Sequence, residues 1–599
     1  MDCFTKISAC ILTSHFFSRS AIIHEAPTLL LIVSFRIGEI MRVFKSTISK
    51  SGLTSLVLAL MFTLGSASVS QAATFTVTST ADGGAGSLRE AIDFANASPD
   101  ADAINFAVSG TITLSSTLPF ITVAGGPLTI DGAGQSVIIS GNDSVRVISI
   151  ENPNSPHSPS GAVLEVKNLT IANGRVTAGF SGGGGIVNVR GSLTVTNCVV
   201  RDNRAPHGGG VFNIQGSLTI SNSNFTGNAA TIDWGGGVSS DSSSTTITGS
   251  TFADNTAVTH GGGVRGSGSS AINITDSIFS GNHAAAGGAF AASYVTNVVN
   301  STLSNNTADM GGAIYGILGE GAPFVSIRNS TLSGNIATTQ GGAIYLIAGL
   351  NNVSNSTFSN NSAPEGGGVY GLPDPGAGGI NNSTFFNSDV VNPFAGQGFP
   401  LPMSNTIVAG STCSGVTDGG YNIDTGATCG FSGTSQSNFG GLLLDPAGLK
   451  DNGGSTKTIA LQWGSTAINS IPVGTNGCGA VDQTDQRGIA RPQGSGCDIG
   501  AFEVVPDTDG DGVLDNADPC PGTLLADLAD RPAWPKKNRF FAMGDGNFVD
   551  GDGTFSGFTV VDTFGCSGTQ IIQAIGIGEG HDRFGITHGV ILDWIAANQ

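Results

Sequence analysis

Apolar and polar positions along residues 181–390 repeat with a single period. In each repeat a pair of small residues, usually glycines, precedes an apolar residue. A Ser/Thr/Asn-rich run comes next, and then an apolar residue lies three places before an asparagine. Self-similarity at this period is typical of a solenoid. The asparagines, spaced 24 to 29 residues apart, are Asn203, Asn228, Asn255, Asn282, Asn306, Asn335 and Asn361.

The runs between the glycines have the period of a β-strand. Residues 217–223 and 271–277 alternate apolar with polar side chains, so that one face would be buried. Good helix formers are scarce, which argues against helical repeats. Three short strands with tight Gly and Asn turns would fill one repeat. The pattern therefore predicts an all-β parallel β-helix, in which each strand pairs with its equivalent about 4.8 Å away in the next coil.

Stacking of equivalent positions places like side chains above one another. Phe225, Phe252 and Phe279 are expected to form an apolar column in the core. The seven asparagines are expected to form an amide ladder, each side chain bonding to its neighbours and to the turn backbone. The glycine directly before the apolar residue is expected to supply a positive φ at the corner.

The repeats, assigned to residues 171–400, resemble those of the polymorphic outer membrane protein family. Such repeats pair a Gly-Gly-Ala-Ile-like element with Phe-x-x-Asn, and residues 311–314 and 279–282 carry the match. The resemblance covers about a third of the chain. It implies a right-handed, pectin-lyase-like β-helix on a bacterial surface.

The N-terminal part contains a candidate export signal. Residues 1–40 differ in character from the rest of the chain and are interpreted as an upstream artefact. In residues 41–72, basic residues precede the apolar run 53–64, and a small-residue cleavage site ends the segment, which predicts a signal peptide. The alternative is a membrane anchor, but the run is short for a span, so no membrane span is expected in the mature chain.

Residues 73–170 are predicted to cap the solenoid and to form its first coils. Ser87 with Glu90 has the form of a capping box, and residues 88–95 place apolar side chains on one helical face. A helix here would cover the open end of the core. The segment resembles the Ser-Leu-Arg-Glu-Ala motif of bacterial surface proteins, with Gly86 where a cysteine is usual.

Residues 401–505 depart from the repeat. Residues 485–492 and 498–503 resemble the terminal region of the choice-of-anchor Q β-helix surface proteins. An export signal together with closely spaced cysteines predicts two disulfides formed in an oxidising compartment, which would staple the last coils. From closeness in sequence, the predicted pairs are Cys413 with Cys429 and Cys478 with Cys497.

Residues 506–523 are the stretch with explicit site chemistry. Acidic side chains occupy positions 1, 3, 5, 9 and 12 of a loop with glycine at position 6, the spacing of a calcium loop, and position 7 offers its carbonyl. Oxygen ligands at this density suit Ca²⁺ rather than zinc. The Cys-Pro directly after the loop resembles the thrombospondin type 3 repeat, and the alternative is a flexible acidic linker. The predicted ligands are Asp507, Asp509, Asp511, Val513, Asp515 and Asp518.

The tail, residues 524–599, has no assigned role. Two short helices are predicted in it, at residues 570–575 and 587–597.

The low content of charged residues and the acidic net charge limit the kinds of binding partner. Charged residues are only 11 % of the 599 residues, the net charge is −20, and residues 181–390 contain no lysine and five arginines. Nucleic acid is not expected as a partner, because phosphate binding needs clustered Lys and Arg. We expect a secreted or cell-surface protein of a bacterium, with glycans or cell-surface components as partners.

An enzyme would need side chains that converge. A hydrolase needs two or three carboxylates on one face, but Asp202 and Asp254 take equivalent positions two coils apart, about 10 Å. His207, His260 and His283, near the glycine corners, are interpreted as turn residues rather than a catalytic or metal row.

The sequence therefore favours a non-enzymatic solenoid with a structural, adhesive or glycan-contacting role. The alternative is a carbohydrate-active enzyme, either a polysaccharide lyase or a hydrolase, since the fold often carries such sites. A third hypothesis, a processed autotransporter-like passenger, implies export with a separate translocator.

Overall fold

A computed structural model describes the chain from residue 72 onward, with gaps. The predicted upstream segment 1–40 and almost all of the predicted signal peptide 41–72 lie outside the described residues. No helix in the described part is both long and apolar enough to cross a membrane. The described residues are 72–122, 126–151, 161–177, 182–316, 325–373, 379–393, 395–397, 399–509, 511, 513, 515, 518–523, 536–576 and 584–598.

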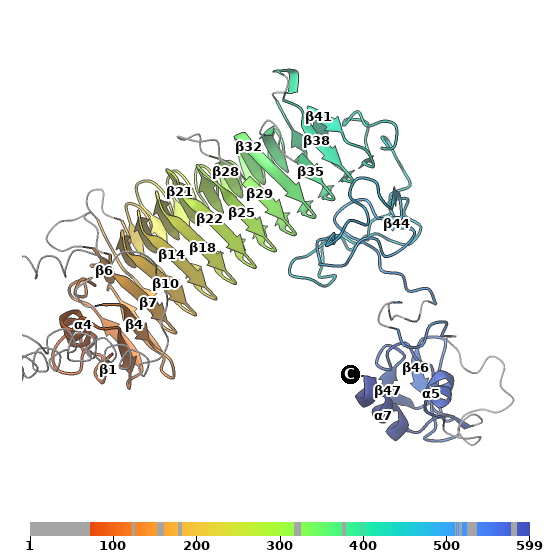
Figure 1. Cartoon of the computed structure of the whole chain (residues 1–599), viewed down its shortest axis with the longest axis horizontal. Helices are drawn as coiled ribbons and strands as arrows, with labels where there is room; N and C mark the ends of the chain where they lie inside the picture. Colours follow the sequence, from red (N-terminus) through yellow and green to blue (C-terminus); the bar gives the residue numbers. More distant parts are fainter. Residues whose placement is uncertain are drawn as a thin grey trace, which may run out of the picture. The chain divides into compact units, whose positions relative to one another are not determined.

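Residues from β1 (Thr74–Val77) to β42 (Ile423–Asp424) fold as a parallel β-helix (Figure 1). Among the described residues, five coils have four strands rather than the predicted three, because a short strand follows the ladder asparagine, whereas other coils have three. One such coil contains β13 (Val211–Ile214), β14 (Ser217–Ser221), β15 (Asn224–Thr226) and β16 (Ala229–Ala230). Gln215, with φ 51°, makes the turn between the first two strands.

The first two strands of each coil join a sheet of 24 strands, and the third joins a sheet of 13 strands. The 24-stranded sheet has two columns, and the long strand β32 (Ile344–Ser354) crosses both. The other strands of its glycine-led column are β6 (Ile148–Ile150), β9 (Ile186–Val189), β17 (Val238–Asp241), β21 (Val264–Ser267), β24 (Phe290–Ala292), β28 (Ile314–Gly316), β34 (Val369–Pro373), β37 (Val390–Val391) and β40 (Cys413–Ser414).

The second column of this sheet carries the Ser/Thr-rich strands. They are β2 (Asp102–Phe106), β4 (Leu128–Asp131), β7 (Val163–Lys167), β10 (Ser192–Thr196), β18 (Ser244–Thr248), β22 (Ala271–Thr275), β25 (Thr296–Val299), β29 (Val325–Arg328), β35 (Gly379–Asn381), β38 (Leu401–Ser404) and β41 (Val416–Asp418), together with β1 and β14.

The 13-stranded sheet runs in chain order along the same coils. Its other strands are β3 (Gly110–Thr113), β5 (Val137–Ser140), β8 (Thr170–Ala172), β11 (Val199–Arg201), β19 (Thr251–Ala253), β23 (Ile278–Ser280), β26 (Thr302–Ser304), β30 (Thr331–Ser333), β33 (Thr357–Ser359), β36 (Thr384–Phe386) and β39 (Ile407–Ala409). The short fourth strands are β12 (Arg204–Ala205), β16, β20 (Thr256–Ala257), β27 (Thr307–Met310) and β31 (Ile336–Gln340), and a 3₁₀ turn, η2, spans Ala395–Gln397.

The core phenylalanines stack as the repeat predicts. Phe225 pairs in register with Phe252, which pairs with Phe279. Their ring centroids lie 4.7 and 4.8 Å apart, and the planes differ by 11° and 3°. All three are fully buried. This close contact between identical rings in adjacent coils fixes the register of the 13-stranded sheet.

The predicted asparagines form a continuous buried amide ladder. Asn228 donates from its backbone N and from Nδ2 to Asn255 Oδ1, both at 3.0 Å. Asn255 Nδ2 donates to the carbonyl of Phe225 at 2.9 Å and to Asn282 Oδ1 at 3.0 Å. The pattern extends from Asn203 to Asn361, where Ser388 takes the next position. Each amide thus satisfies buried donors and acceptors of its neighbours.

A second buried ladder, of serines, was not predicted. The backbone N–H of Ser223 donates to Ser250 Oγ at 3.1 Å, and that of Ser250 donates to Ser277 Oγ at 3.2 Å. Each hydroxyl donates to the carbonyl two residues before it. The sequence held a signal, since a serine precedes the stacked apolar residue by two places in seven repeats. Cys198 takes the same position, and burial raises the pKa of its thiol to about 11.

The glycines act differently from the prediction. The positive φ lies at the first glycine of the group, such as Gly208 at 56° and Gly261 at 68°, rather than at the glycine directly before the apolar residue. Gly210, which precedes the apolar Val211, is needed for space, because a Cβ there would overlap the carbonyl oxygen of Gly237 in the next coil. One glycine makes the turn, and the others let adjacent coils approach.

Helix α4 (Leu88–Ala97) caps the N-terminal end of the core. Ser87 Oγ accepts from the N–H of Glu90 at 3.2 Å, as predicted, but Glu90 Oε2 accepts from the N–H of Gly86 at 2.6 Å rather than from Ser87. The helix buries one apolar face in the same hydrophobic cluster as the coils: Leu88, Ala91, Ile92 and Ala95.

Residues 440–505, the lateral segment, lie along the outer face of the 13-stranded sheet. Gln486 bridges two coils, since Thr357 Oγ1 donates to its Oε1 at 2.6 Å and its Nε2 donates to Thr331 Oγ1 at 2.9 Å. The N–H of Ala501 donates to Thr384 Oγ1 at 3.1 Å. The segment therefore covers the side of several coils, as well as lying near the last ones.

Both predicted disulfides form, but they staple different parts. Cys413–Cys429, with Cα atoms 4.8 Å apart, ties the last coil to the turn directly after it. Cys478–Cys497, with Cα atoms 5.7 Å apart, closes a loop within the lateral segment, beside the antiparallel pair β43 (Ile471–Pro472) and β44 (Gly496–Cys497). Only the first pair matches the predicted role of stapling the last coils.

Buried ion pairs hold the lateral segment together. Arg491 Nη1 lies 2.8 Å from Glu503 Oε2, and Arg487 Nη2 lies 2.7 Å from Asp485 Oδ2. Asp498 accepts two backbone N–H groups at 2.6 and 2.7 Å. Burial, with the nearby charge of Glu503, raises the pKa of Asp498 to about 7. These residues belong to the two stretches that carry the choice-of-anchor Q resemblance.

Residues 536–598 form a small unit with its own apolar core. It contains β45 (Phe541–Ala542), β46 (Asn547–Val549) and β47 (Phe555–Thr559) in an antiparallel sheet, and helices α5 (Gly568–Ile575) and α7 (His588–Asn598) at the two predicted positions. Ser567 and Gln570 make a capping box at α5. The buried core includes Phe541, Phe548, Ile571, Ile572 and Ile591.

Replacing one rung of the amide ladder is expected to destabilise the solenoid. Asn255→Ala removes the acceptor of two buried N–H groups of Asn228 and a donor to the carbonyl of Phe225, so the free energy of unfolding should fall by at least about 2 kcal/mol. Urea denaturation followed by circular dichroism measures the change. Asn273→Ala, at an exposed position of β22, is the control and should change stability by less than about 0.5 kcal/mol. Equal effects of the two substitutions would contradict the ladder's role.

Asp498 is expected to make stability depend on pH. Because its folded pKa is raised above the unfolded value, the folded state holds the proton more tightly. Its contribution is then complete below about pH 4 and is lost as the pH rises through about 7. Relative to Asp498→Asn, the natural chain should lose on the order of 2 kcal/mol between pH 4.5 and 7.5. Thermal unfolding at both pH values tests this, and parallel profiles would contradict it.

Candidate functional site

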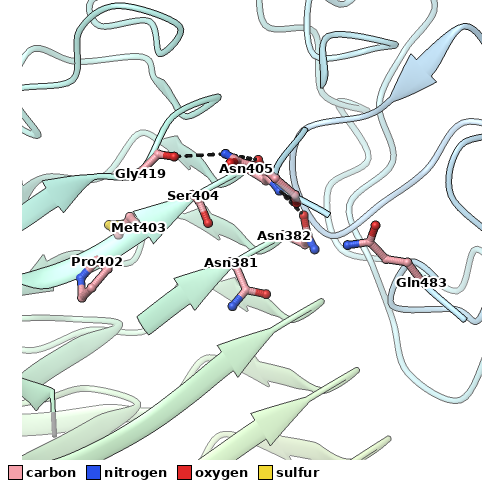
Figure 2. A pocket seen from close by; sticks show the side chains of 9 residues that line it. Asn381, Asn382, Pro402, Met403, Ser404, Asn405, Gly419 and Gln483 are labelled. Carbon is pink, nitrogen blue, oxygen red and sulfur yellow. Dashed lines mark hydrogen bonds between the residues drawn. The ribbon is translucent and has the colours of Figure 1, made fainter. Parts of the chain in front are cut away.

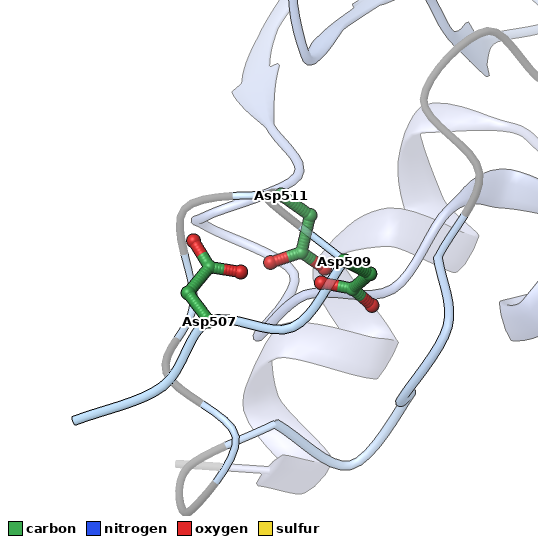
Figure 3. Close-up of side chains that lie close together, drawn as sticks. All are labelled: Asp507, Asp509 and Asp511. Carbon is green, nitrogen blue, oxygen red and sulfur yellow. The ribbon is translucent and has the colours of Figure 1, made fainter. Parts of the chain in front are cut away.

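Three predicted ligands of the acidic loop converge. Asp507, Asp509 and Asp511 each direct one carboxylate oxygen into a common region, where the three atoms lie within 4.8 Å of one another (Figure 3). Among the residues that the structure describes, this is the single group of three or more acidic, His or Cys side chains close enough to share a metal ion. The spacing of alternate acidic residues brings the three side chains to one side of the loop.

Two oxygens of this group are buried without a hydrogen-bond partner. Asp509 Oδ2 accepts from the N–H groups of Gly522 and Thr523 at 2.7 and 2.6 Å, but its Oδ1 has no partner. Asp511 Oδ1 accepts from the N–H of Val513 at 2.8 Å, but its Oδ2 has none. Burial is the main cause that raises the pKa of Asp511, and the neighbouring aspartates add to it. Unpaired buried carboxylate oxygens fit a cation.

The remaining predicted ligands differ in their distance from the three converging aspartates. Asp515 is turned back on the loop, where it accepts the N–H and the Oγ1 proton of Thr508, both at 2.6 Å, and these bonds lower its pKa. Asp518 stays near the group, and burial raises its pKa. Val513, predicted as a ligand through its carbonyl, donates its N–H to Asp511 Oδ1. The structure thus brings together fewer carboxylates than the motif predicts.

The tail closes the acidic loop, which the sequence pattern did not predict. A third disulfide joins Cys520 to Cys566, with Cα atoms 5.1 Å apart. Gly565, with φ 80°, lies so close that a Cβ on it would overlap the carboxylates of Asp511 and Asp518. The signal was present, because Cys520 and Cys566 are the two cysteines left after the predicted pairs, the single Cys198 of the repeats and the two cysteines of residues 1–40 are set aside.

The three histidines of the repeats do not form a shared site. His207 stacks on Trp234, with ring centroids 4.8 Å apart, and His260 lies 5.7 Å from the ring of Tyr315. His283 was predicted to lie near a glycine corner, and this was wrong. It directly follows a ladder asparagine and pairs with residues of the short fourth strands. Burial is the main cause that lowers the pKa of His207 and of His260.

The two acids at equivalent positions of the repeats, Asp202 and Asp254, occupy turns. They have φ 56° and 54°, and the position between them, one coil from each, is Gly227, with φ 65°. A Cβ at Gly227 would approach Asp202 Oδ1 at 3.0 Å, so the carboxylate already fills the space beside the glycine. The alternation of acid and glycine keeps like charges two coils apart.

An aromatic column on the glycine-led strands was also not predicted. Tyr315, Tyr345 and Tyr370 are equivalent positions, and successive ring centroids lie 5.4 Å apart with planes within 4°. Burial raises the pKa of each phenol. Because the rings cover each other's faces, the column contributes packing between coils.

A pocket of about 310 Å³ lies between the last coils and the lateral segment (Figure 2). Asn405 Nδ2 donates to Asn382 Oδ1 at 2.9 Å, and Asn476 Nδ2 donates to Asn405 Oδ1 at 3.2 Å and to the carbonyl of Gly419 at 3.0 Å. Gln483 Oε1 is buried without a partner. The pocket is lined by Asn381, Asn382, Pro402, Met403, Ser404, Asn405, Gly419, Asn476 and Gln483.

The pocket joins residues about 100 positions apart, which explains why the sequence did not indicate it. Two of its asparagines, Asn382 and Asn405, occupy equivalent turns with positive φ, at 47° and 53°. Asn readily adopts this conformation, so these turns can be found in the sequence. That the lateral segment closes over them depends on tertiary contacts.

Of the comparisons with known proteins, the one with a family model bears on the fold. A comparison with curated proteins finds no match. The crystal structure of jun a 1, the major allergen from cedar pollen, is similar over 50 % of this chain and 79 % of its own, at 16 % sequence identity and a TM-score of 0.25. A likeness this distant says nothing of ligand or activity. The family model described as "Right handed beta helix region" matches residues 215–392. These coils are therefore a right-handed parallel β-helix.

Proposed function

We propose that this chain is a secreted or cell-surface β-solenoid with a structural, adhesive or glycan-contacting role and a calcium-binding loop. The observation that carries the proposal is the outer row of uncharged polar side chains held in register along the coils. Thr194, Thr219, Thr246, Asn273 and Asn297 occupy one such row. Hydroxyl and amide groups both donate and accept hydrogen bonds, as sugar hydroxyls do.

The placement of the acids supports a binding surface rather than a reaction centre. Hydrolysis of a glycosidic bond needs two carboxylates on either side of the bond. Asp202 and Asp254 stand at turns two coils apart, with Gly227 between them. Buried carboxylates such as Asp498 and Glu503 are engaged by arginine and backbone N–H groups of the lateral segment.

Export and attachment to a surface are supported by the cysteines and by the sequence resemblances. Three disulfides persist only where the compartment is oxidising. The predicted signal peptide and the likeness of the repeats to polymorphic outer membrane proteins support a bacterial cell surface.

Calcium binding is supported by the unpaired oxygens of Asp509 and Asp511 and by the approach of Asp518 to Gly565. A hard cation with oxygen ligands would replace missing hydrogen bonds and remove repulsion between the carboxylates. The same ion would strengthen the contact between the loop and the tail, which Cys520–Cys566 already fastens.

Titration calorimetry with CaCl₂ on the chelator-treated protein is expected to show one saturable site. Asp511→Asn removes charge at a ligand position and should weaken binding roughly 10-fold or more. Asp545→Asn, at an exposed turn of the same tail, is the matched control and should bind as the natural chain does. Asp515→Asn should have less effect than Asp511→Asn. Failure of the natural chain to bind at millimolar Ca²⁺ would overturn the calcium proposal.

The functional proposal as a whole is tested on a panel of polysaccharides and on whole bacterial surfaces, with calcium and with chelator. We expect retention of the purified chain on at least one glycan, without release of sugar. Release of unsaturated or reducing sugar ends would instead establish the carbohydrate-active enzyme, and lack of retention on every glycan and surface would leave only a structural role.

A further inference from the structure

We propose that the pocket between the last coils and the lateral segment binds a neutral saccharide unit. The inference rests on the proposed glycan-contacting function and assigns it a site and a ligand class. The residues that line the pocket are asparagine, glutamine, serine, proline, methionine and glycine, and none has a charged side chain. Its volume of about 310 Å³ is at the lower end of small-ligand sites, which span about 300–1,000 Å³.

The polar lining favours a neutral ligand over other classes. Cation sites combine carbonyl oxygens with carboxylate, His or Cys ligands, and anion sites use Lys, Arg or clustered N–H groups. No acidic, basic, His or Cys side chain lines this pocket. An apolar ligand would leave the amides unpaired at a cost. Side-chain amides both donate and accept, which matches hydroxyl groups that do the same.

The amides are held before any ligand arrives. Asn405 bonds to Asn382, and Asn476 bonds to Asn405 and Gly419, so that three asparagines from separate segments are fixed in one cluster. Preorganised donors and acceptors lose less entropy on binding. Pro402, which is exposed, adds an apolar surface against which the C–H face of a sugar ring can pack.

Gln483 supplies a hydrogen-bond acceptor that a ligand would satisfy. Its Oε1 is buried and has no hydrogen-bond partner, and Figure 2 shows its amide directed toward Asn382. A buried unpaired acceptor costs free energy, which a ligand hydroxyl would recover by donating to it. The loop that carries Gln483 is held by Cys478–Cys497, so the site requires the folded lateral segment.

The experiment measures saturation-transfer NMR and titration calorimetry with defined probes on the full chain. The neutral probes are D-glucose, D-galactose, N-acetyl-D-glucosamine and their β-linked disaccharides, and the charged ones are D-galacturonate and D-glucosamine. We expect saturable binding of at least one neutral probe. Gln483→Ala and Ser404→Ala should each weaken it roughly 3- to 10-fold, the effect of one lost hydrogen bond.

Matched variants keep the outcomes distinct. Gln483→Ala removes an unpaired group and should leave the melting temperature unchanged or slightly raised. Asn224→Ala, an exposed amide on β15 that belongs neither to the pocket nor to the outer polar row, should bind the probe like the natural chain. Binding that survives both Gln483→Ala and Ser404→Ala would overturn this site while leaving glycan contact elsewhere on the solenoid. Preference for a charged probe, or no binding of any neutral one, would overturn the ligand class, and the polysaccharide panel decides the broader function separately.

Discussion

The structure depends on one constraint: in a parallel stack, every side chain has the equivalent side chain of the next coil as its nearest neighbour. A buried residue must therefore be compatible with a copy of itself at one coil's distance. Phenylalanine meets this condition by stacking, as at Phe225, Phe252 and Phe279. Asparagine meets it because an amide donates and accepts at once, so each rung satisfies the next. Serine does so by accepting from the next backbone N–H. A charged side chain cannot, because it would repel its copy at short range.

The same constraint explains how much the sequence predicted. Because the repeat shows which residues are equivalent in successive coils, it predicts which residues stack. The phenylalanine column and the amide ladder were predicted in this way. The number of strands was wrong for the five coils with a fourth strand, because that strand is as short as Ala229–Ala230 and has no alternation of its own in the sequence. The place of the positive φ was wrong because all the glycines of a group look alike in sequence. Gly208 makes the turn, whereas Gly210 gives room for the next coil.

Predictions weaken where the repeat ends, because contacts there join segments far apart in the chain. The cysteine pairs at 413–429 and 478–497 could be predicted from spacing, but the pairing of Cys520 with Cys566 spans 46 residues and two elements. Residues 440–505 lie along the side of the coils. Their position depends on hydrogen bonds of Gln486 with Thr331 and Thr357, more than 120 positions earlier in the chain. The acidic loop illustrates the intermediate case. Its spacing predicted the converging Asp507, Asp509 and Asp511, but Asp515 is held by Thr508, and Gly565 of the tail closes the group.

Stacking also limits where each kind of binding chemistry can occur. Because like charges in adjacent coils repel, Asp202 and Asp254 are separated by Gly227, and the outer rows are mostly hydroxyls and amides. A ligand that lies along the coils must then be recognised through uncharged hydrogen bonds, which favours a polyhydroxyl surface over an ion. Clustered carboxylates need an irregular segment that has no copy above or below it, and residues 506–523 are such a segment. The pocket at Asn405 combines both features. Its asparagines on the last coils are amides like those of the repeat, and a non-repeating segment closes the pocket and adds Gln483.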